Sequence, residues 1–518
     1  MAKGETLFRL VKALSGSEKK YFKLFASRHV IKGKNNYLKL FEEIEKQLVY
    51  DEKKIFEYFA GQSYVRHLAR HRHYLFNMIL KSLQAFYSEA TIELKLKNLL
   101  QQASILSNKN LPEHAFRLLQ KARGIAVKSC KDIQYLEIIK AEQKMLRSFV
   151  SIRPLKGNLM QSAEQEADIL KRITNYNEYQ KLANRIFILD KSGGGLPRDE
   201  KTIEKFRNEY NNPLMRNVHN ALSLPAKDVF YYIQTAFFLI TEDLNRALEA
   251  AKKRIRLLDK YPFMKEDDPE KYIAATINYL TSCLRLHRYG AFVRGTRKCK
   301  NEIRKMNAYK LSGKLLQFNA IVYNLELSYY IRTGNFKEGE YFIKHEDAIM
   351  GKHFQKFDKL NQLVIYYNMA YIYFGSGHYA LAASSINKIL NDTDENIRQD
   401  IYAFARILNL IIHYELGNRE LLEYIVKSTY RFLHRRNRLY KSEQLIVAFI
   451  QKEIPAVISK KDELDAFRKL KKEFQKIMHL PFEQKIMEYF DILSWLESKT
   501  GQKSFASIIQ AKVKRTGK

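Results

Sequence analysis

The chain has few of the residues that interrupt helices or cross-link small domains. Its 518 residues include nine prolines and twenty glycines, and it has no long low-complexity tract. Because proline and glycine most often punctuate regular structure, most of the chain is expected to be ordered. The three cysteines, Cys130, Cys283 and Cys299, have no CxxC spacing. They form neither a disulfide framework nor a zinc motif, and indicate reduced thiols in a cytoplasmic protein.

Long apolar runs are also missing. No stretch of about 18 apolar residues occurs, so no membrane span is expected. The most apolar segment, residues 229–240, is too short and has polar flanks. The first 22 residues are amphipathic and charged, without the apolar core of a signal peptide. These features favour a cytoplasmic location.

Motifs for chemistry are lacking as well. Gly193–Gly195 is the only glycine run, but no GK[ST] follows it and no strand is predicted before it, which indicates a loop. His67 and His71 lie one helical turn apart without the zincin glutamate or an acidic third ligand. Paired carboxylates and Ser/His/Asp or Cys/His sets at motif spacing are absent. We therefore predict no enzyme, no cofactor, no metal site and no small-molecule substrate.

Negative charge is scarce relative to positive charge. Lys and Arg number 90 against 56 for Asp and Glu, a formal net charge of +34. Residues 301–400 carry 12 basic and 11 acidic side chains, residues 401–518 carry 23 and 13, and the first hundred carry 19 and 10. Such a field attracts nucleic acid, acidic proteins or anionic membranes. Solvated helix faces are the plainer alternative.

What the chain does contain is helical periodicity throughout. Ser15 and Glu18 have capping-box spacing, and Asp51 is predicted to be the N-cap of a short helix ending near Gly61. A long helix is expected from Ser63 to Tyr87. We predict an all-α fold with four parts: a helical head (1–90), a first helical-repeat segment (91–190), a solenoid (201–455), and C-terminal capping helices with a basic tail (456–518).

One segment, residues 366–390, has the pattern of a helix, a tight turn and a second helix. Small side chains stand where the two helices must touch, and Gly377 suits the left-handed end of the first helix. The positions that carry this packing are Ala370, Tyr373, Gly377, Tyr379 and Ala382. The segment resembles the tetratricopeptide repeat, although Tyr366 replaces the first-helix tryptophan and the closing proline is missing.

Weaker copies surround this segment. They centre on Tyr289, Gly334 and Gly417, and their turns lie about 40–47 residues apart, more than the 34 of the consensus repeat. The resemblance covers roughly residues 225–430 and implies a degenerate α-solenoid of antiparallel helix pairs. It also implies an interaction protein, because stacked helix pairs present a long groove for other chains.

The first functional hypothesis is a non-catalytic scaffold or adaptor that binds a protein or peptide on the solenoid groove. Exposed first-helix positions would line that groove, since Asn offers hydrogen bonds to a backbone and Tyr offers amphipathic contact. The candidates are Asn324, Tyr367, Asn368 and Tyr371. Packing of both tyrosines against the neighbouring repeat is the alternative.

The second hypothesis is a nucleic-acid-binding regulator. Three arginines follow a short helix and the Gly61 turn in an order that resembles helix-turn-helix binding. A second basic segment spans residues 431–441, and residues 294–305 form another basic helix. The candidate phosphate contacts are Arg66, Arg70, Arg72, Arg431, Arg435, Arg436 and Arg438.

Overall fold

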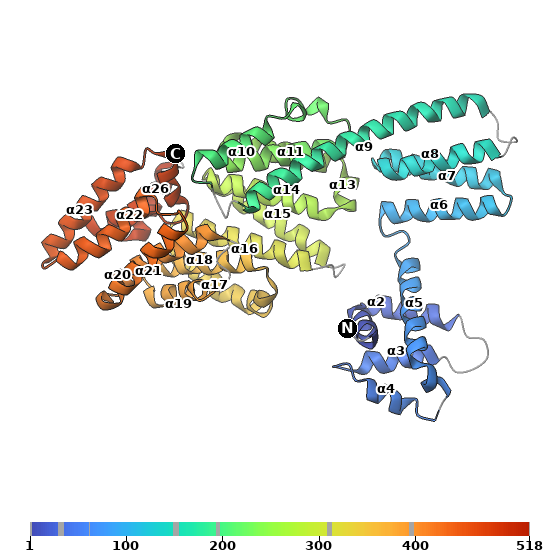
Figure 1. Cartoon of the computed structure of the whole chain (residues 1–518), viewed down its shortest axis with the longest axis horizontal. Coiled ribbons are helices and arrows are strands. Elements are labelled where there is room, and N and C mark those ends of the chain that lie inside the picture. The colour runs from blue at the N-terminus through green and yellow to red at the C-terminus, as the bar shows by residue number, and fades with distance from the viewer. Residues whose placement is uncertain are drawn as a thin grey trace. The chain divides into compact units, whose positions relative to one another are not determined.

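The computed structural model describes residues 3–28, 36–61, 63–148, 155–192, 197–307, 313–392 and 398–516. Regular structure in these ranges is entirely helical, without a strand, which confirms the predicted all-α class. Most helices pack against their neighbours in the chain. Two compact units exist, residues 1–173 and 174–518, and α9 (Leu155–Ser192) carries the boundary between them (Figure 1). The boundary at residue 173 falls inside residues 91–190, which the sequence predicts as one helical-repeat segment.

Unit 1 contains two hydrophobic cores. One is built from α1 to α5 and the other from α6 to α9. The helices that precede α9 are α1 (Lys3–Ala13), α2 (Gly16–Ser27), α3 (Asn36–Lys46), α4 (Glu52–Tyr58), η1 (Ser63–His67), α5 (Leu68–Phe86), α6 (Ile92–Asn108), α7 (Pro112–Lys128) and α8 (Asp132–Ser148). The first core belongs to the stretch predicted as a helical head.

Local signals in the head act as the sequence predicts. Ser15 Oγ accepts the Glu18 N–H at 3.3 Å, and the Glu18 carboxylate accepts the Ser15 N–H at 2.5 Å, which completes a capping box. Asp51 caps α4. The long helix expected from Ser63 starts with the 3₁₀ turn η1 and becomes α-helical only at Leu68. Such turns are common at helix N-termini, where the first N–H groups lack helical partners.

Unit 2 contains the rest of α9 and the remaining helices. These are α10 (Glu200–Tyr210), α11 (Leu224–Ile240), α12 (Leu244–Lys260), α13 (Pro262–Asp267), α14 (Pro269–Arg285), α15 (Tyr289–Asn307), α16 (Gly313–Thr333), α17 (Phe336–Met350), α18 (Lys359–Gly375), α19 (Tyr379–Leu390), α20 (Gln399–Glu415), α21 (Arg419–Arg435), α22 (Lys441–Ala448), α23 (Lys460–Ile477), α24 (Pro481–Gln484), α25 (Ile492–Thr500) and α26 (Phe505–Thr516). In the described residues of this unit, short 3₁₀ or π segments connect the helices: η2 (Pro213–Met215), η3 (Val218–Asn220), η4 (Gly351–Lys356), η5 (Phe449–Glu453), η6 (Ile454–Ala456) and η7 (Lys485–Glu488).

Five evenly spaced turns with a left-handed residue join helix pairs in the described part of unit 2, and a sixth such turn, at Asn437, joins α21 to α22. Glu242, His287, Gly334, Gly377 and Gly417 each adopt a positive φ, and they recur every 40–47 residues as predicted. In the last four of these five turns, the N–H of the following residue donates to the carbonyl five residues before it. This is the Schellman arrangement, which satisfies the last carbonyls of a helix. The unit therefore repeats one local solution for turning a helix back on itself.

The best-matching segment forms α18 and α19. Ala370 and Ala382 are fully buried, and the left-handed Gly377 follows the end of α18. The Tyr379 ring lies 5.3 Å from the ring of Phe374, where it covers the turn. Tyr373 packs at the edge of the same core. The predicted pair of helices joined by a tight turn is confirmed. Alanines at the crossing let the two helix backbones approach.

The C-terminal helices belong to the main core of unit 2. Helix α22 packs on α20 and α21, α23 packs on α22 and α25, and α26 packs on α25 and α16 (Figure 1). Trp495 on α25 is 1% exposed, and its indole N–H donates to Glu415 at 2.6 Å. Within the stretch predicted as capping helices, η7 and α25 follow one another, and Asp491 caps α25 between them.

Candidate functional site

The four predicted groove residues lie on α16 and α18, and all are buried. Asn324 and Asn368 are each 8% exposed, Tyr367 is 3% exposed and Tyr371 is 5% exposed. The Asn368 amide donates to Asn324 Oδ1 at 3.5 Å and to Ser328 Oγ at 3.4 Å. The expectation that these four side chains are exposed is thus corrected: the asparagines join α16 to α18.

The two tyrosines contact the C-terminal segment of the same chain. Tyr367 Oη donates to the Tyr489 carbonyl at 3.3 Å, and the Asp491 N–H donates to Tyr371 Oη at 2.9 Å. The Phe490 ring lies 5.1 Å from the Tyr371 ring. Burial raises the pKa of both tyrosine hydroxyls, so they stay neutral. The chain itself therefore covers the face that the sequence assigns to a partner.

Of the head arginines, two are exposed and one serves the fold. Arg66 is the penultimate residue of η1 and Arg70 lies in the first turn of α5, and both are exposed. Arg72 is mostly buried and donates to Glu52 and to Tyr50 Oη, each at 2.7 Å. It ties α5 to the start of α4. The head thus offers two of the three predicted cations to a phosphate.

The second predicted basic segment is divided in the same way. Arg431 and Arg435 are exposed on α21, whereas Arg436 and Arg438 are partly buried. The Arg436 guanidinium lies 5.9 Å from the Phe432 ring centroid, in the range of a cation–π contact. Arg431 follows Tyr430 and Arg435 follows His434, and the exposed rings of Tyr430 and His434 stack on one another.

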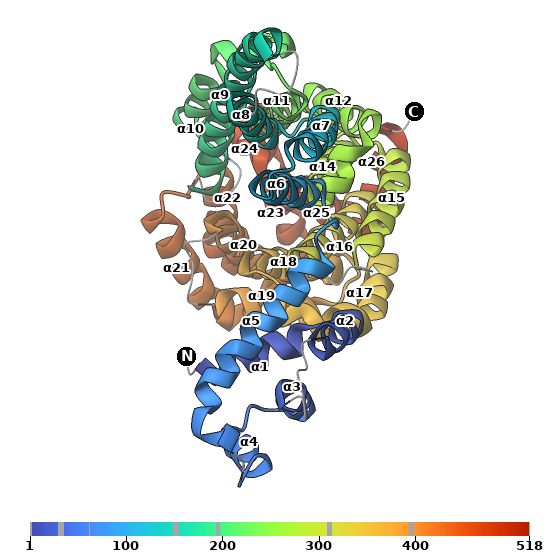
Figure 2. The ribbon, with the colours of Figure 1, turned by 90° about the vertical axis from the view of Figure 1, so that its right-hand side faces the viewer.

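A basic hollow that the sequence indicates only in part lies between α12, α14 and α15. Both α12 and α15 pack on α14, and Figure 2 shows the three helices side by side. The hollow has a volume of about 330 Å³. Its lining residues are Lys252, Ile255, Arg256, Thr276, Tyr279, Ala291, Arg294, Gly295 and Lys298. We call this set the basic hollow.

Two of its four cations have counter-ions. Lys252 pairs with Glu249 at 2.7 Å, and Lys298 lies 3.7 Å from the nearer Asp259 oxygen. Arg256 and Arg294 form no ion pair or hydrogen bond with any residue that the structure describes. The site therefore has two uncompensated guanidinium groups.

The electrostatics of neighbouring groups agree with this excess of positive charge. The hydrogen bond from Lys252 lowers the pKa of Glu249, and the charges of Arg256 and Arg288 lower it further. Burial raises the pKa of Tyr279 to about 12, so its hydroxyl keeps its proton at neutral pH. The hollow thus combines positive rim charges with a neutral hydroxyl.

Close helix packing forms the base of the hollow. A Cβ on Gly295 would lie 2.7 Å from Leu280 Cδ2 and 3.4 Å from the Tyr279 ring, so a larger residue would force the Leu280 side chain to shift where α15 meets α14. The basic run 294–305 indicates charge on α15, but not the α12 residues that complete the site. The α12 and α15 residues lie about 40 positions apart in the sequence, so the sequence alone does not show that they line one hollow.

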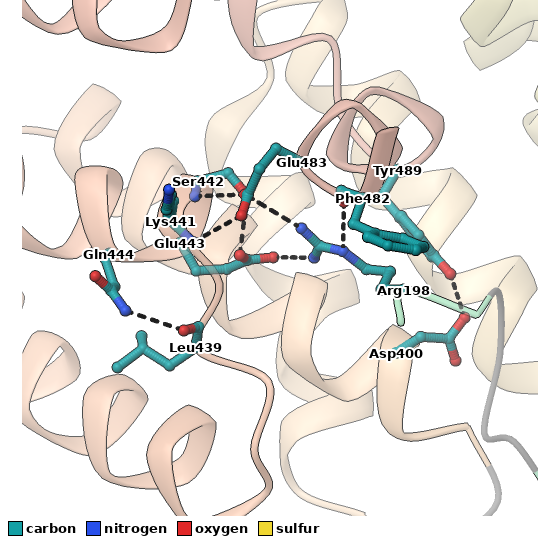
Figure 3. Close-up of polar contacts among 10 residues, drawn as sticks. All are labelled: Arg198, Asp400, Leu439, Lys441, Ser442, Glu443, Gln444, Phe482, Glu483 and Tyr489. Carbon is teal, nitrogen blue, oxygen red and sulfur yellow. Dashed lines mark hydrogen bonds and ion pairs between the residues drawn. The ribbon is translucent and has the colours of Figure 1, made fainter. Parts of the chain in front are cut away.

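Unit 2 also contains a buried ionic cluster around Arg198, shown in Figure 3. The Arg198 guanidinium donates to Glu443, to Ser442 Oγ at 3.1 Å and to the Phe482 carbonyl at 3.0 Å. Glu483 accepts the Ser442 N–H at 2.9 Å. The cluster joins the segment before α10 to α22 and α24. All its buried polar groups have partners, as a structural role requires.

The remaining sequence candidates give no further site. Gly193–Gly195 lies outside the described residues. His71 Nδ1 is 3.3 Å from Tyr37 Oη, and no group of three or more His, Cys, Asp or Glu side chains in the described ranges is arranged to hold a metal ion. None of the helices in these ranges is long and apolar enough to cross a bilayer.

No protein family model, curated protein or solved structure matches this chain.

Proposed function

We propose that this chain is a non-catalytic scaffold, an α-solenoid resembling the tetratricopeptide repeat, that binds an acidic segment of a protein partner. The recurring helix pairs and Schellman turns of residues 224–435 support the solenoid assignment. Arrays of this kind bind partners through extended surfaces of stacked helices.

The partner surface is assigned away from the face that carries Tyr367 and Tyr371. That face already holds residues 489–510 of the chain, and Gln510 Nε2 donates to the Gly334 carbonyl at 3.0 Å. Since both side chains and backbone groups are already satisfied there, another chain gains little from docking on it.

The observation that carries the proposal is the pair of uncompensated arginines in the basic hollow. Arg256 and Arg294 are both exposed and line one concavity. Guanidinium groups bind carboxylates through two parallel hydrogen bonds, which an acidic peptide can supply. An acidic partner segment therefore fits this surface.

The test uses two double charge reversals with equal effects on net charge. Arg256→Glu with Arg294→Glu changes the basic hollow, and Arg431→Glu with Arg435→Glu changes α21. Binding of a short fluorescein-labelled, glutamate-rich peptide is followed by anisotropy. We expect the first variant to weaken binding about tenfold or more, because reversing two contacting charges costs at least ~1.4 kcal/mol. The α21 variant should bind like the unaltered chain.

Equal losses in both variants would show only non-specific attraction to a basic protein. Absence of binding at low salt to the unaltered chain would contradict the proposal.

A second candidate function, nucleic-acid binding, is favoured by α21. Exposed Tyr430 and His434 stack with centroids 5.9 Å apart, beside Arg431 and Arg435. Aromatic rings interleaved with arginine suit stacking on bases and contact with phosphates. The same two variants separate the functions: reduced retention on single-stranded DNA only in the α21 variant, with steep salt dependence, favours this candidate.

A further inference from the structure

We propose that the basic hollow recognises a phosphomonoester dianion carried on a phosphorylated serine or threonine of the partner. This inference rests on the proposed function and names the chemistry of the ligand. It is carried by the charge balance, the donor types and the size of the hollow.

The charge balance selects a dianion over a single carboxylate. With Lys252 paired to Glu249 and Lys298 near Asp259, the uncompensated charge of the hollow is that of Arg256 and Arg294. A phosphomonoester carries about −1.5 to −2 charges at pH 7, which matches two guanidinium groups. A carboxylate matches only one.

The donors also suit phosphate. Each guanidinium presents a planar fork of N–H groups that fits two phosphate oxygens. Tyr279 also lines the hollow, but its hydroxyl already forms a hydrogen bond with Cys283, so the guanidinium groups supply the donors for phosphate. Phosphate oxygens accept several hydrogen bonds at once, so they use more of these donors than a carboxylate does.

The size of the hollow favours a phosphate attached to a chain. Its volume of about 330 Å³ is roughly ten times that of one water molecule in the liquid. The lining includes the apolar groups Ile255, Ala291 and Gly295 beside the cations. A phosphoserine or phosphothreonine side chain with its adjoining backbone uses both parts of this lining.

The experiment compares three labelled peptides of one acidic sequence, with serine, glutamate or phosphoserine at the central position. Phosphoserine should bind the unaltered chain at least tenfold more tightly than serine, with glutamate between them. Arg294→Gln should remove most of this preference, whereas Arg297→Gln should retain it. Arg297 is the matched control, since it is exposed on the same helix but does not line the hollow.

Arg256→Lys with Arg294→Lys retains the positive charge but removes the planar guanidinium groups. It should reduce the preference for phosphoserine more than the affinity for the serine peptide. Lowering the pH from 7.5 to 5.5 should weaken phosphopeptide binding, since the second phosphate pKa is about 6. Thermal melts check that each variant folds like the unaltered chain.

Three results would overturn the inference, and they are distinct from failure of the proposed function. If phosphorylation adds less than twofold while the serine peptide still binds, the phosphate site is wrong and the scaffold stands. If free phosphoserine competes at the same concentration as the phosphopeptide, the ligand is a small phosphomonoester. If single-stranded DNA binds more tightly through Arg294, the ligand is nucleic acid. Failure of every peptide contradicts the proposed function itself.

Discussion

Replacement of Arg198 tests the buried ionic cluster of unit 2. The Arg198 side chain is 3% exposed and Glu443 is 1% exposed, so Arg198→Met leaves a buried carboxylate without its cation. It also removes the donors to Ser442 and to the Phe482 carbonyl, and the stacking on Tyr440, whose ring centroid lies 3.9 Å away.

The expected loss is about 3–5 kcal/mol in the free energy of unfolding. This is the usual cost of removing one partner from a buried ion pair, because the desolvated charge that remains is uncompensated. At about 2 °C per kcal/mol for a large unit, the melting temperature should fall by roughly 5–10 °C.

The assay is intrinsic fluorescence during thermal or urea unfolding. Trp495 is the only tryptophan of the chain and is buried in unit 2, so its emission reports on this unit alone. Arg207→Met is the matched control, since Arg207 pairs with the exposed Glu200 and Glu204, and loss of these surface pairs should leave the unfolding transition nearly unchanged.

A double variant separates the loss of charge from the loss of packing. Arg198→Met combined with Glu443→Gln removes both charges and should recover part of the lost stability. If Arg198→Met unfolds within about 1 kcal/mol of the unaltered chain, the cluster contributes little and the reasoning from buried charge fails.

The remaining predictions use the same fluorescence readout. Asp400 is a buried carboxylate, and Glu488 lies beside Arg332 and Arg285; desolvation alone would raise the pKa of each, but neighbouring arginines outweigh it and lower both pKa values. Because lowered values favour the folded state above the ordinary pKa, unit 2 should lose stability as the pH falls below the ordinary values of 3.8 and 4.5, and a flat profile there would contradict this. Gly377→Ala should cost about 1 kcal/mol, because φ is +84° and no atom crowds the Cβ position. Gly375→Ala, whose Cβ would overlap a phenylalanine ring of α17, should cost about 1–3 kcal/mol by overpacking, and the reverse order would show that space matters less than φ. Phe490→Ala should cost about 3–5 kcal/mol through the cavity it leaves beside α18; a loss below about 1 kcal/mol would mean that the C-terminal segment is only loosely held.

Much of the fold follows from residues close together in the chain. The capping box of Ser15 and Glu18, the left-handed Gly377 and the small Ala370 and Ala382 each depend on neighbours within a few turns. Helical periodicity, caps and turn residues act locally, which is why the sequence predicts them.

Less of the candidate site than of the fold could be predicted from the sequence. The charge of the chain, counted in blocks, points to its two ends, whereas the basic hollow lies within residues 252–298. The predicted groove tyrosines, Tyr367 and Tyr371, have the aromatic and amphipathic character of a binding surface, but such residues serve equally well to hold Asp491 and its neighbours. Chemical character alone does not distinguish a partner contact from an internal one.

The sequence by itself determined that this chain is helical, where its helices turn, and that it carries a large excess of positive charge. Only the tertiary structure decided which distant side chains meet. Arg198 reaches Glu443, 245 residues away, and Arg256 on α12 shares a hollow with Arg294 on α15. The physical reason is that helix formation is governed by nearby residues, whereas contacts between distant side chains depend on how every intervening helix pair packs.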